Sequence, residues 1–163
     1  MSRYVLDTSA LIKVVLPEPG SEQVVSLVWE AVRGDSQLFT LDFAFLEAAN
    51  VLWKRCVREE LSDAPPQRLL ATLLGLSPRP IQVVNSRQVL KRALELSIAL
   101  GLPVYDCAFV ALCEHQQAAL VTGDRQQAKA VSAVSTILVP PPLLLADGAT
   151  NPEEEADTAS SDG

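Results

Sequence analysis

Four acidic residues in this chain each lie beside a short apolar run, and they are spread over most of its length: Asp7, Glu47, Asp106 and Asp124. A cluster of three or four carboxylates repels itself too strongly to stay ionised without a cation, and Mg²⁺ and Mn²⁺ prefer carboxylate oxygens. One or two such ions can activate water, neutralise a phosphodiester and stabilise its leaving oxygen. The chain has a single histidine, His115, which disfavours a histidine general base. The acids therefore predict metal-dependent phosphodiester hydrolysis, provided that the fold brings them together.

Each acid also has an ordinary structural interpretation. Asp7 and Asp106 can cap helices, Glu47 suits the first turn of a helix, and Asp124 suits a turn. Taken singly, each acid favours its structural role. Taken together, in this order and beside these apolar runs, they favour a metal site.

The elements that must position these acids alternate between strand and helix. Apolar runs predict strands at 3–6, 37–41, 81–84, 119–122 and 136–139. Helical periodicity, caps and breakers predict helices at 10–15, 21–33, 45–58, 63–76, 86–100, 106–116 and 125–131. Such alternation indicates an α/β fold, a three-layer α/β/α sandwich with a central, mostly parallel sheet. Ligands bind at the carboxyl ends of parallel strands, so all four acids should share that edge of the sheet.

Several side chains are predicted to be buried. The inward side of helix 45–58 is expected to comprise Leu46, Ala49, Val51, Leu52 and Val57. The three cysteines, Cys56, Cys107 and Cys113, are odd in number and lack C-x-x-C spacing, which argues against a zinc site or a disulfide framework and favours core positions. The aromatic residues Trp29, Trp53 and Tyr105 are expected in the core or at an interface.

The net charge of −7 is concentrated at the end of the chain. From Asp147 onward there are six acids and no base, so residues 1–146 carry 13 basic and 14 acidic residues. Acidity therefore does not exclude a nucleic-acid substrate. We expect one folded domain at 1–142 and an acidic, disordered tail at 143–163, in which Leu143 to Leu145 can dock on the domain or on a partner. No membrane helix or signal peptide is predicted, and a cytoplasmic location is expected.

Four segments carry a family resemblance. They are VLDTSALI at 5–12, EAANVL at 47–52, YDCAFVAL at 105–112 and LVTGD at 120–124. Together they resemble the four motifs of the PIN domain family, over about residues 3–140, and the length is similar to that of the toxin ribonucleases of VapBC toxin-antitoxin systems. The resemblance implies a PIN-like fold that cuts RNA as an endonuclease with Mg²⁺ or Mn²⁺, forms a homodimer and is inhibited by a small antitoxin.

The resemblance also implies roles for individual residues. Asp7, Glu47, Asp106 and Asp124 would be the catalytic, metal-binding acids, and the supporting polar groups would be Ser9, Asn50 and Thr122. Asn50 lies one turn after Glu47 on the same helical face, which independently favours a functional role, whereas Thr8 is interpreted as a turn residue.

Two features depart from the family pattern. The acidic tail is an extension, and the basic surface is modest. The candidate phosphate contacts lie on two helices, and each group can equally be a solvated helix face: Lys54, Arg55 and Arg58; Arg87, Lys91 and Arg92.

Three alternatives stay open at this point. One is a non-catalytic interaction protein with the same fold, and another is a PIN nuclease that acts in RNA processing without an antitoxin. A phosphatase with Asp7 as nucleophile is disfavoured, because Ser9 stands where a second acid is needed.

Overall fold

The protein is built around a five-stranded sheet in which every neighbouring pair of strands is parallel. The computed structural model describes residues 1–61, 63–134 and 142–145. The strand order is β3-β2-β1-β4-β5. The strands are β1 (Ser2–Leu6), β2 (Ser36–Leu41), β3 (Ile81–Val84), β4 (Ala119–Thr122) and β5 (Leu143–Leu144). This parallel sheet confirms the predicted fold class.

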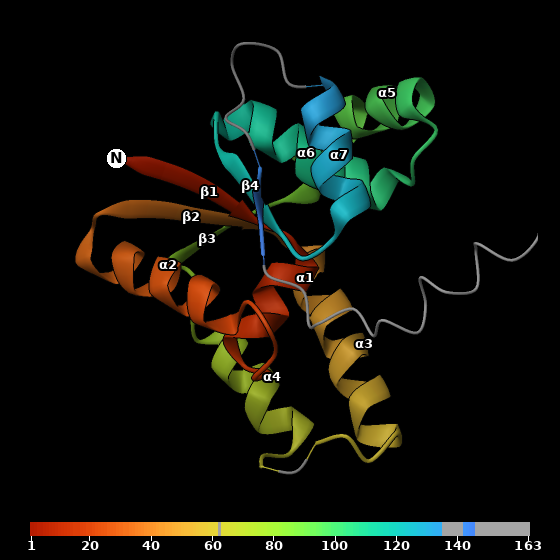
Figure 1. Ribbon diagram of the computed structural model, residues 1–163. Coiled ribbons are helices and arrows are strands. Elements are labelled where there is room, and N and C mark those ends of the chain that lie inside the picture. Colours follow the sequence, from red (N-terminus) through yellow and green to blue (C-terminus); the bar gives the residue numbers. More distant parts are fainter. Residues whose placement is uncertain (62, 135–141, 146–163) are drawn as a thin grey trace, which may run out of the picture.

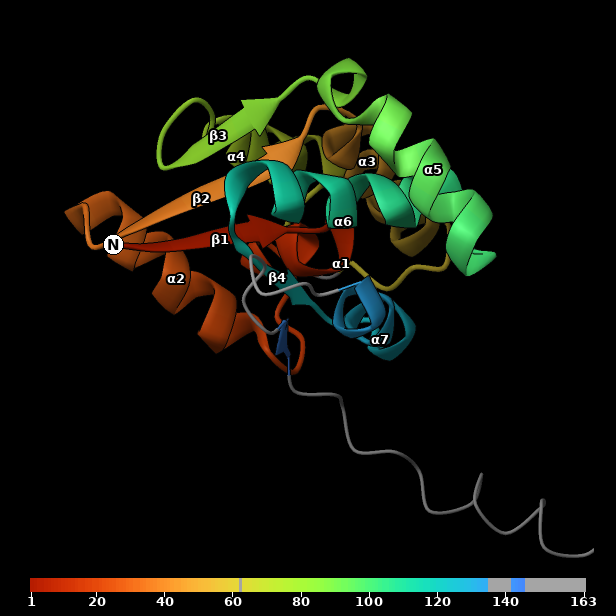
Figure 2. The same cartoon turned by 90° about the horizontal axis from the view of Figure 1, so that it is seen from above.

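Helices cover both faces of the sheet. The chain forms α1 (Thr8–Leu11), the 3₁₀ turn η1 (Ile12–Val14), α2 (Ser21–Arg33), α3 (Phe43–Val57), α4 (Pro66–Leu74), the 3₁₀ turn η2 (Ser86–Gln88), α5 (Leu90–Leu100), α6 (Val104–Gln116) and α7 (Arg125–Val134). Helix α6 lies on one face of the sheet, and α1 and α2 lie on the other (Figure 1). A second view, turned by 90°, shows the twisted sheet between these layers (Figure 2). The result is the three-layer α/β/α arrangement.

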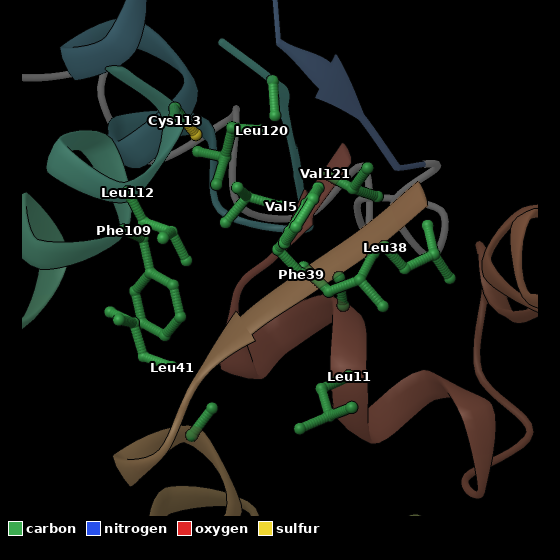
Figure 3. Close-up of a cluster of buried hydrophobic side chains, with 14 of the residues drawn as sticks. Val5, Leu11, Leu38, Phe39, Leu41, Phe109, Leu112, Cys113, Leu120 and Val121 are labelled. Atoms are coloured by element: carbon green, nitrogen blue, oxygen red, sulfur yellow. The ribbon is translucent and has the colours of Figure 1, made fainter. Parts of the chain in front are cut away.

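The core is centred on β1, β4 and α6. Val5, Leu6, Leu120 and Val121 are completely buried, as expected for strands covered on both faces. Seven consecutive residues of α6, Cys107–Cys113, are also buried. Phe109 and Leu112 of α6 lie on one side of β2, and Leu11 of α1 lies on the other (Figure 3). The sheet is therefore held in place from both faces.

The sheet continues past residue 142, where the sequence placed the start of the tail. Leu143 and Leu144 pair in parallel with Val121 and Thr122 of β4, and Leu145 is buried. The apolar triplet therefore docks on its own domain, because it extends the sheet by one strand. The strand predicted at 136–139 and the rest of the predicted tail, 146–163, lie outside the described residues.

Helix α3 differs most from its predicted packing. Leu46 is 75% exposed and Val57 is 65% exposed, so their predicted inward orientation is wrong. Helix α3 projects from the sheet (Figure 1) and buries only Ala44, Ala48 and Leu52. It has more apolar residues than one packed face can cover.

Other predicted core positions divide into buried and exposed groups. Cys107 and Cys113 are buried as predicted, whereas Cys56 is exposed, because it lies on α3 away from the core. Trp29, Trp53 and Tyr105 are also exposed, which excludes the core alternative for these aromatics.

Within the described ranges, no single helix is long and apolar enough to cross a membrane. Taken together, helices α5 and α6 are long and apolar enough to match a membrane span, but the two helices are bent by 117° where they meet.

Candidate active site at the carboxyl ends of the strands

The four predicted acids line one pocket. Its volume is about 170 Å³, and its walls are Asp7, Thr8, Ser9, Glu47, Asp106, Phe109, Asp124 and Gln127. Asp7 directly follows β1, and Asp124 follows β4 by two residues. Because β1 and β4 are parallel neighbours, their carboxyl ends meet at this edge. The first turn of α6 adds Asp106, and the second turn of α3 adds Glu47, because α3 begins at Phe43, two residues earlier than the sequence predicted.

Helix α3 is fixed at this edge by the side chain of Asp42. One oxygen of Asp42, Oδ1, accepts hydrogen bonds from the Phe43 N–H at 2.9 Å and the Ser86 N–H at 3.1 Å. The Asp42 N–H also donates to the carbonyl of Val84, at 3.1 Å. These bonds tie the start of α3 to the end of β3, and they set the position from which Glu47 reaches the pocket.

Asp7 is the most deeply buried of the four acids, with only 2% of its surface exposed. It is the N-cap of α1, where its Oδ1 accepts the Ala10 N–H at 2.8 Å and the Ser9 hydroxyl at 2.6 Å. Its Oδ2 accepts the hydroxyl of Thr122. The capping role suggested by the sequence is therefore real, and it coexists with a place in the pocket.

The direction of these hydrogen bonds follows from the backbone. The Gly123 N–H donates to the Ser9 hydroxyl at 2.8 Å, and the Asp124 N–H donates to the Thr122 hydroxyl at 2.9 Å. Because both hydroxyls accept from N–H groups, their own protons are free to point at Asp7. Ser9 and Thr122 thus connect the β4–α7 turn to the Asp7 carboxylate.

Burial and like charges perturb three of the acids. Burial raises the pKa of Asp7; the hydrogen bonds from Ser9, Thr122 and Ala10 oppose this rise, and the charge of Asp124 adds to it. The pKa of Glu47 is raised first by burial; the nearby Thr8 side chain opposes this rise, and the charges of Asp106 and Asp7 add to it. Burial also raises the pKa of Asp106, with a contribution from Asp124. The carboxylates therefore share one electrostatic environment.

The donor set fits a divalent cation. Glu47 Oε1 and the Thr8 hydroxyl oxygen are both buried without a hydrogen-bond partner. Mutually repelling carboxylates with an unpaired buried oxygen are stabilised by a hard cation. In the described part of the chain, no group of three or more Asp, Glu, His or Cys side chains already converges as metal ligands do. The pocket therefore brings the oxygen donors to one place, but they are not yet close enough together to coordinate one ion.

Sequence reasoning missed two polar pocket residues and the aromatic wall residue Phe109, and it proposed one residue, Asn50, that lies elsewhere. Thr8, interpreted as a turn residue, and Gln127, which was not considered, both line the pocket. Gln127 lies three residues after Asp124, and this spacing was the available signal. Asn50 is instead exposed on α3 and does not line the pocket.

The candidate phosphate contacts fall into two classes. Arg55 pairs with Glu18 and Glu60, and Arg92 pairs with Glu95 and Glu114. These arginines are engaged within the protein. Four others form no ion pair with any residue that the structure describes and are exposed: Lys54, Arg58, Arg87 and Lys91.

Comparisons with known proteins place this geometry in a family. The PIN domain family model matches residues 4–132. Ribonuclease VapC3 of Pyrobaculum aerophilum is 37% identical over 134 residues, which cover 82% of this chain and 98% of that protein.

Solved structures share the fold at lower sequence identity. PAE2754 from Pyrobaculum aerophilum has a TM-score of 0.59 and 24% identity, covering 82% of this chain and 86% of its own. VapC20 of Mycobacterium tuberculosis, a Sarcin-Ricin loop cleaving toxin, has a TM-score of 0.57 and 14% identity, covering 85% and 99%. VapBC2 from Rickettsia felis, solved with a promoter DNA fragment, has a TM-score of 0.52 and 13% identity, covering 87% and 96%. With a family model that spans most of its length and a relative above one third identity, this chain belongs to the PIN domain family.

Proposed function

We propose that this chain is a metal-dependent endoribonuclease and acts as the toxin of a VapBC-type pair. The observation that carries the proposal is the single pocket that contains Asp7, Glu47, Asp106 and Asp124. The similarity to Ribonuclease VapC3 supports RNA as the substrate.

In this proposal the four carboxylates hold Mg²⁺ or Mn²⁺. When bound, such an ion supplies an activated water and neutralises charge on the scissile phosphate. Ser9 and Thr122 hold Asp7 in one orientation through their hydroxyl protons. The buried Thr8 hydroxyl lies near Glu47 but forms no hydrogen bond of ordinary geometry, so it can donate to a phosphate oxygen.

We also propose two protein partners, a second copy of the chain and a small antitoxin, and a cytoplasmic location where RNA and antitoxin are found together. Exposed apolar side chains on two helices support protein contacts: Leu46, Trp53 and Val57 on α3; Leu90, Leu94 and Ile98 on α5. Apolar surface that gathers on adjacent turns of a helix is typical of protein interfaces. The similarity of the fold to that of VapBC2 supports the proposal of an antitoxin partner.

The proposal is tested by RNA cleavage with purified protein. Wild type with Mn²⁺ should cut RNA, and EDTA should stop the reaction. Asp7→Asn should reduce the rate to below about one hundredth of wild type, because it removes a charge from the metal-binding set. Asp35→Asn is the matched control, since Asp35 lies beside the amino end of β2 and is 62% exposed.

Equal cleavage by wild type and Asp7→Asn would contradict the assignment of the site. A folded wild type that does not cut RNA with Mn²⁺ would instead favour the non-catalytic interaction protein.

A further inference from the structure

Gln127 is a buried polar residue in the carboxylate pocket. It is the third residue of α7, it lines the pocket, and it is only 6% exposed. A buried amide is stabilising only when it is hydrogen bonded. Its neighbour Gln126 is exposed, so the two adjacent glutamines occupy opposite environments on one helix.

The hydrogen bonds of Gln127 reach two of the four acidic residues. Its side-chain Nε2 donates to the main-chain carbonyl of Asp106, at 3.1 Å. Its backbone N–H donates to Oδ1 of Asp124, at 3.3 Å. One residue therefore joins the first turn of α6, which carries Asp106, to the first turn of α7, which follows Asp124.

This link acts against an electrostatic force. Asp106 and Asp124 come from different elements and carry like charges that repel each other across the pocket. Repulsion favours a wider separation of the two helix ends, whereas a cation needs both carboxylates within reach. The neutral side-chain amide of Gln127 binds the backbone of Asp106, and the backbone N–H of the same residue binds the carboxylate of Asp124. Gln127 therefore restrains that separation without adding charge.

We propose that Gln127 is a positioning residue that sets the separation of Asp106 and Asp124, and thereby the affinity of the pocket for a divalent cation. The inference rests on the proposed function, because it assigns a structural cause to metal affinity at that site. Residues that orient metal ligands from outside typically change affinity by about 10- to 100-fold when mutated.

The test replaces Gln127 by residues of similar size that cannot donate a hydrogen bond. Gln127→Met and Gln127→Leu are both made, so that one folded variant suffices, and Gln126→Met is the matched control. Binding of Mn²⁺ alone to the full chain is measured by calorimetry, and thermal unfolding is measured in EDTA. Mn²⁺ binding should weaken about tenfold in the Gln127 variants and stay unchanged in Gln126→Met.

Cleavage provides a second readout. The Mn²⁺ concentration for half-maximal RNA cleavage should rise about tenfold in Gln127→Met, and saturating Mn²⁺ should restore the rate with the KM for RNA unchanged. A residue that only stabilises the fold would lower the melting temperature without this rescue.

The outcomes separate the two proposals. If wild type binds Mn²⁺ and cuts RNA while Gln127→Met matches Gln126→Met, the inference about Gln127 is overturned and the proposed function stands. If wild type neither binds Mn²⁺ nor cuts RNA, the proposed function fails and the inference falls with it.

Discussion

The two sides of the carboxylate pocket differ in how completely their polar atoms are paired. On the side built by β1 and β4, both oxygens of Asp7 accept hydrogen bonds, and Ser9 and Thr122 each also accept a backbone N–H. On the side closed by α3, Glu47 Oε1 and the Thr8 hydroxyl are buried without partners. Paired groups are fixed by the protein itself, whereas unpaired buried groups gain most from a ligand. The strand side fixes the orientation of Asp7, and the helix side leaves buried oxygen atoms that a ligand can bind.

The largest expected effect on stability is at Thr122. Thr122→Val keeps the shape of a completely buried residue but leaves the Asp124 N–H and Asp7 Oδ2 without that hydroxyl. The free energy of unfolding should fall by about 2–3 kcal/mol, measured by urea denaturation in EDTA.

Thr8→Val is the matched comparison, because it removes a buried hydroxyl that lies near Glu47 without a hydrogen bond of ordinary geometry. Its unfolding free energy should stay within about 0.5 kcal/mol of wild type. Equal losses in the two variants would show that the two sides of the pocket do not differ.

A smaller loss is expected at Ser9, which is less buried than Thr122. Ser9→Ala removes one donor to Asp7 and one acceptor for the Gly123 N–H, but water can reach this edge and replace part of both. We expect a loss of about 1 kcal/mol in the same denaturation experiment. A loss as large as that of Thr122→Val would indicate that Ser9, not Thr122, is the principal support of Asp7.

The smallest expected effect is a gain in stability rather than a loss, and it concerns Glu47. Because the folded chain raises the pKa of Asp7, Glu47 and Asp106, it holds their protons more tightly than the unfolded chain does. Without metal, these groups should therefore lower the free energy of unfolding as the pH rises from the ordinary carboxyl range through the raised pKa values. Glu47→Gln should slightly raise the melting temperature at about pH 8 in EDTA and change it less at about pH 5.

The pH comparison has a clear contrary result. If Glu47→Gln lowers the melting temperature in EDTA at the higher pH, the ionised Glu47 is stabilised by contacts that outweigh its burial and its acidic neighbours.

The sequence was most informative where chain direction determines position. Parallel strands bring their carboxyl ends to one edge, so residues far apart in the chain, such as Asp7 and Asp124, could be expected together from local patterns alone. The strands at 81–84 and 119–122 were predicted with the bounds that the structure has. These features depend on local apolar runs and on the rules of parallel connection.

The sequence was least informative where tertiary contacts choose among equivalent faces. Helix α3 has apolar residues around most of its circumference, and no local pattern reveals that Leu46 and Val57 stay exposed while Ala48 is buried. Asn50 shares a helical face with Glu47 by spacing, yet it lies outside the pocket. The role of Gln127 depends on the distance between α6 and α7, which is a tertiary property.

The central claim is that four carboxylates at one sheet edge hold a divalent cation, and calorimetric titration with Mn²⁺ tests it most directly. Wild type should bind Mn²⁺, and affinity should fall in each of Asp7→Asn, Glu47→Gln, Asp106→Asn and Asp124→Asn, while Asp35→Asn binds as wild type does. Wild-type affinity in all four pocket variants, or no binding by wild type, would contradict the account.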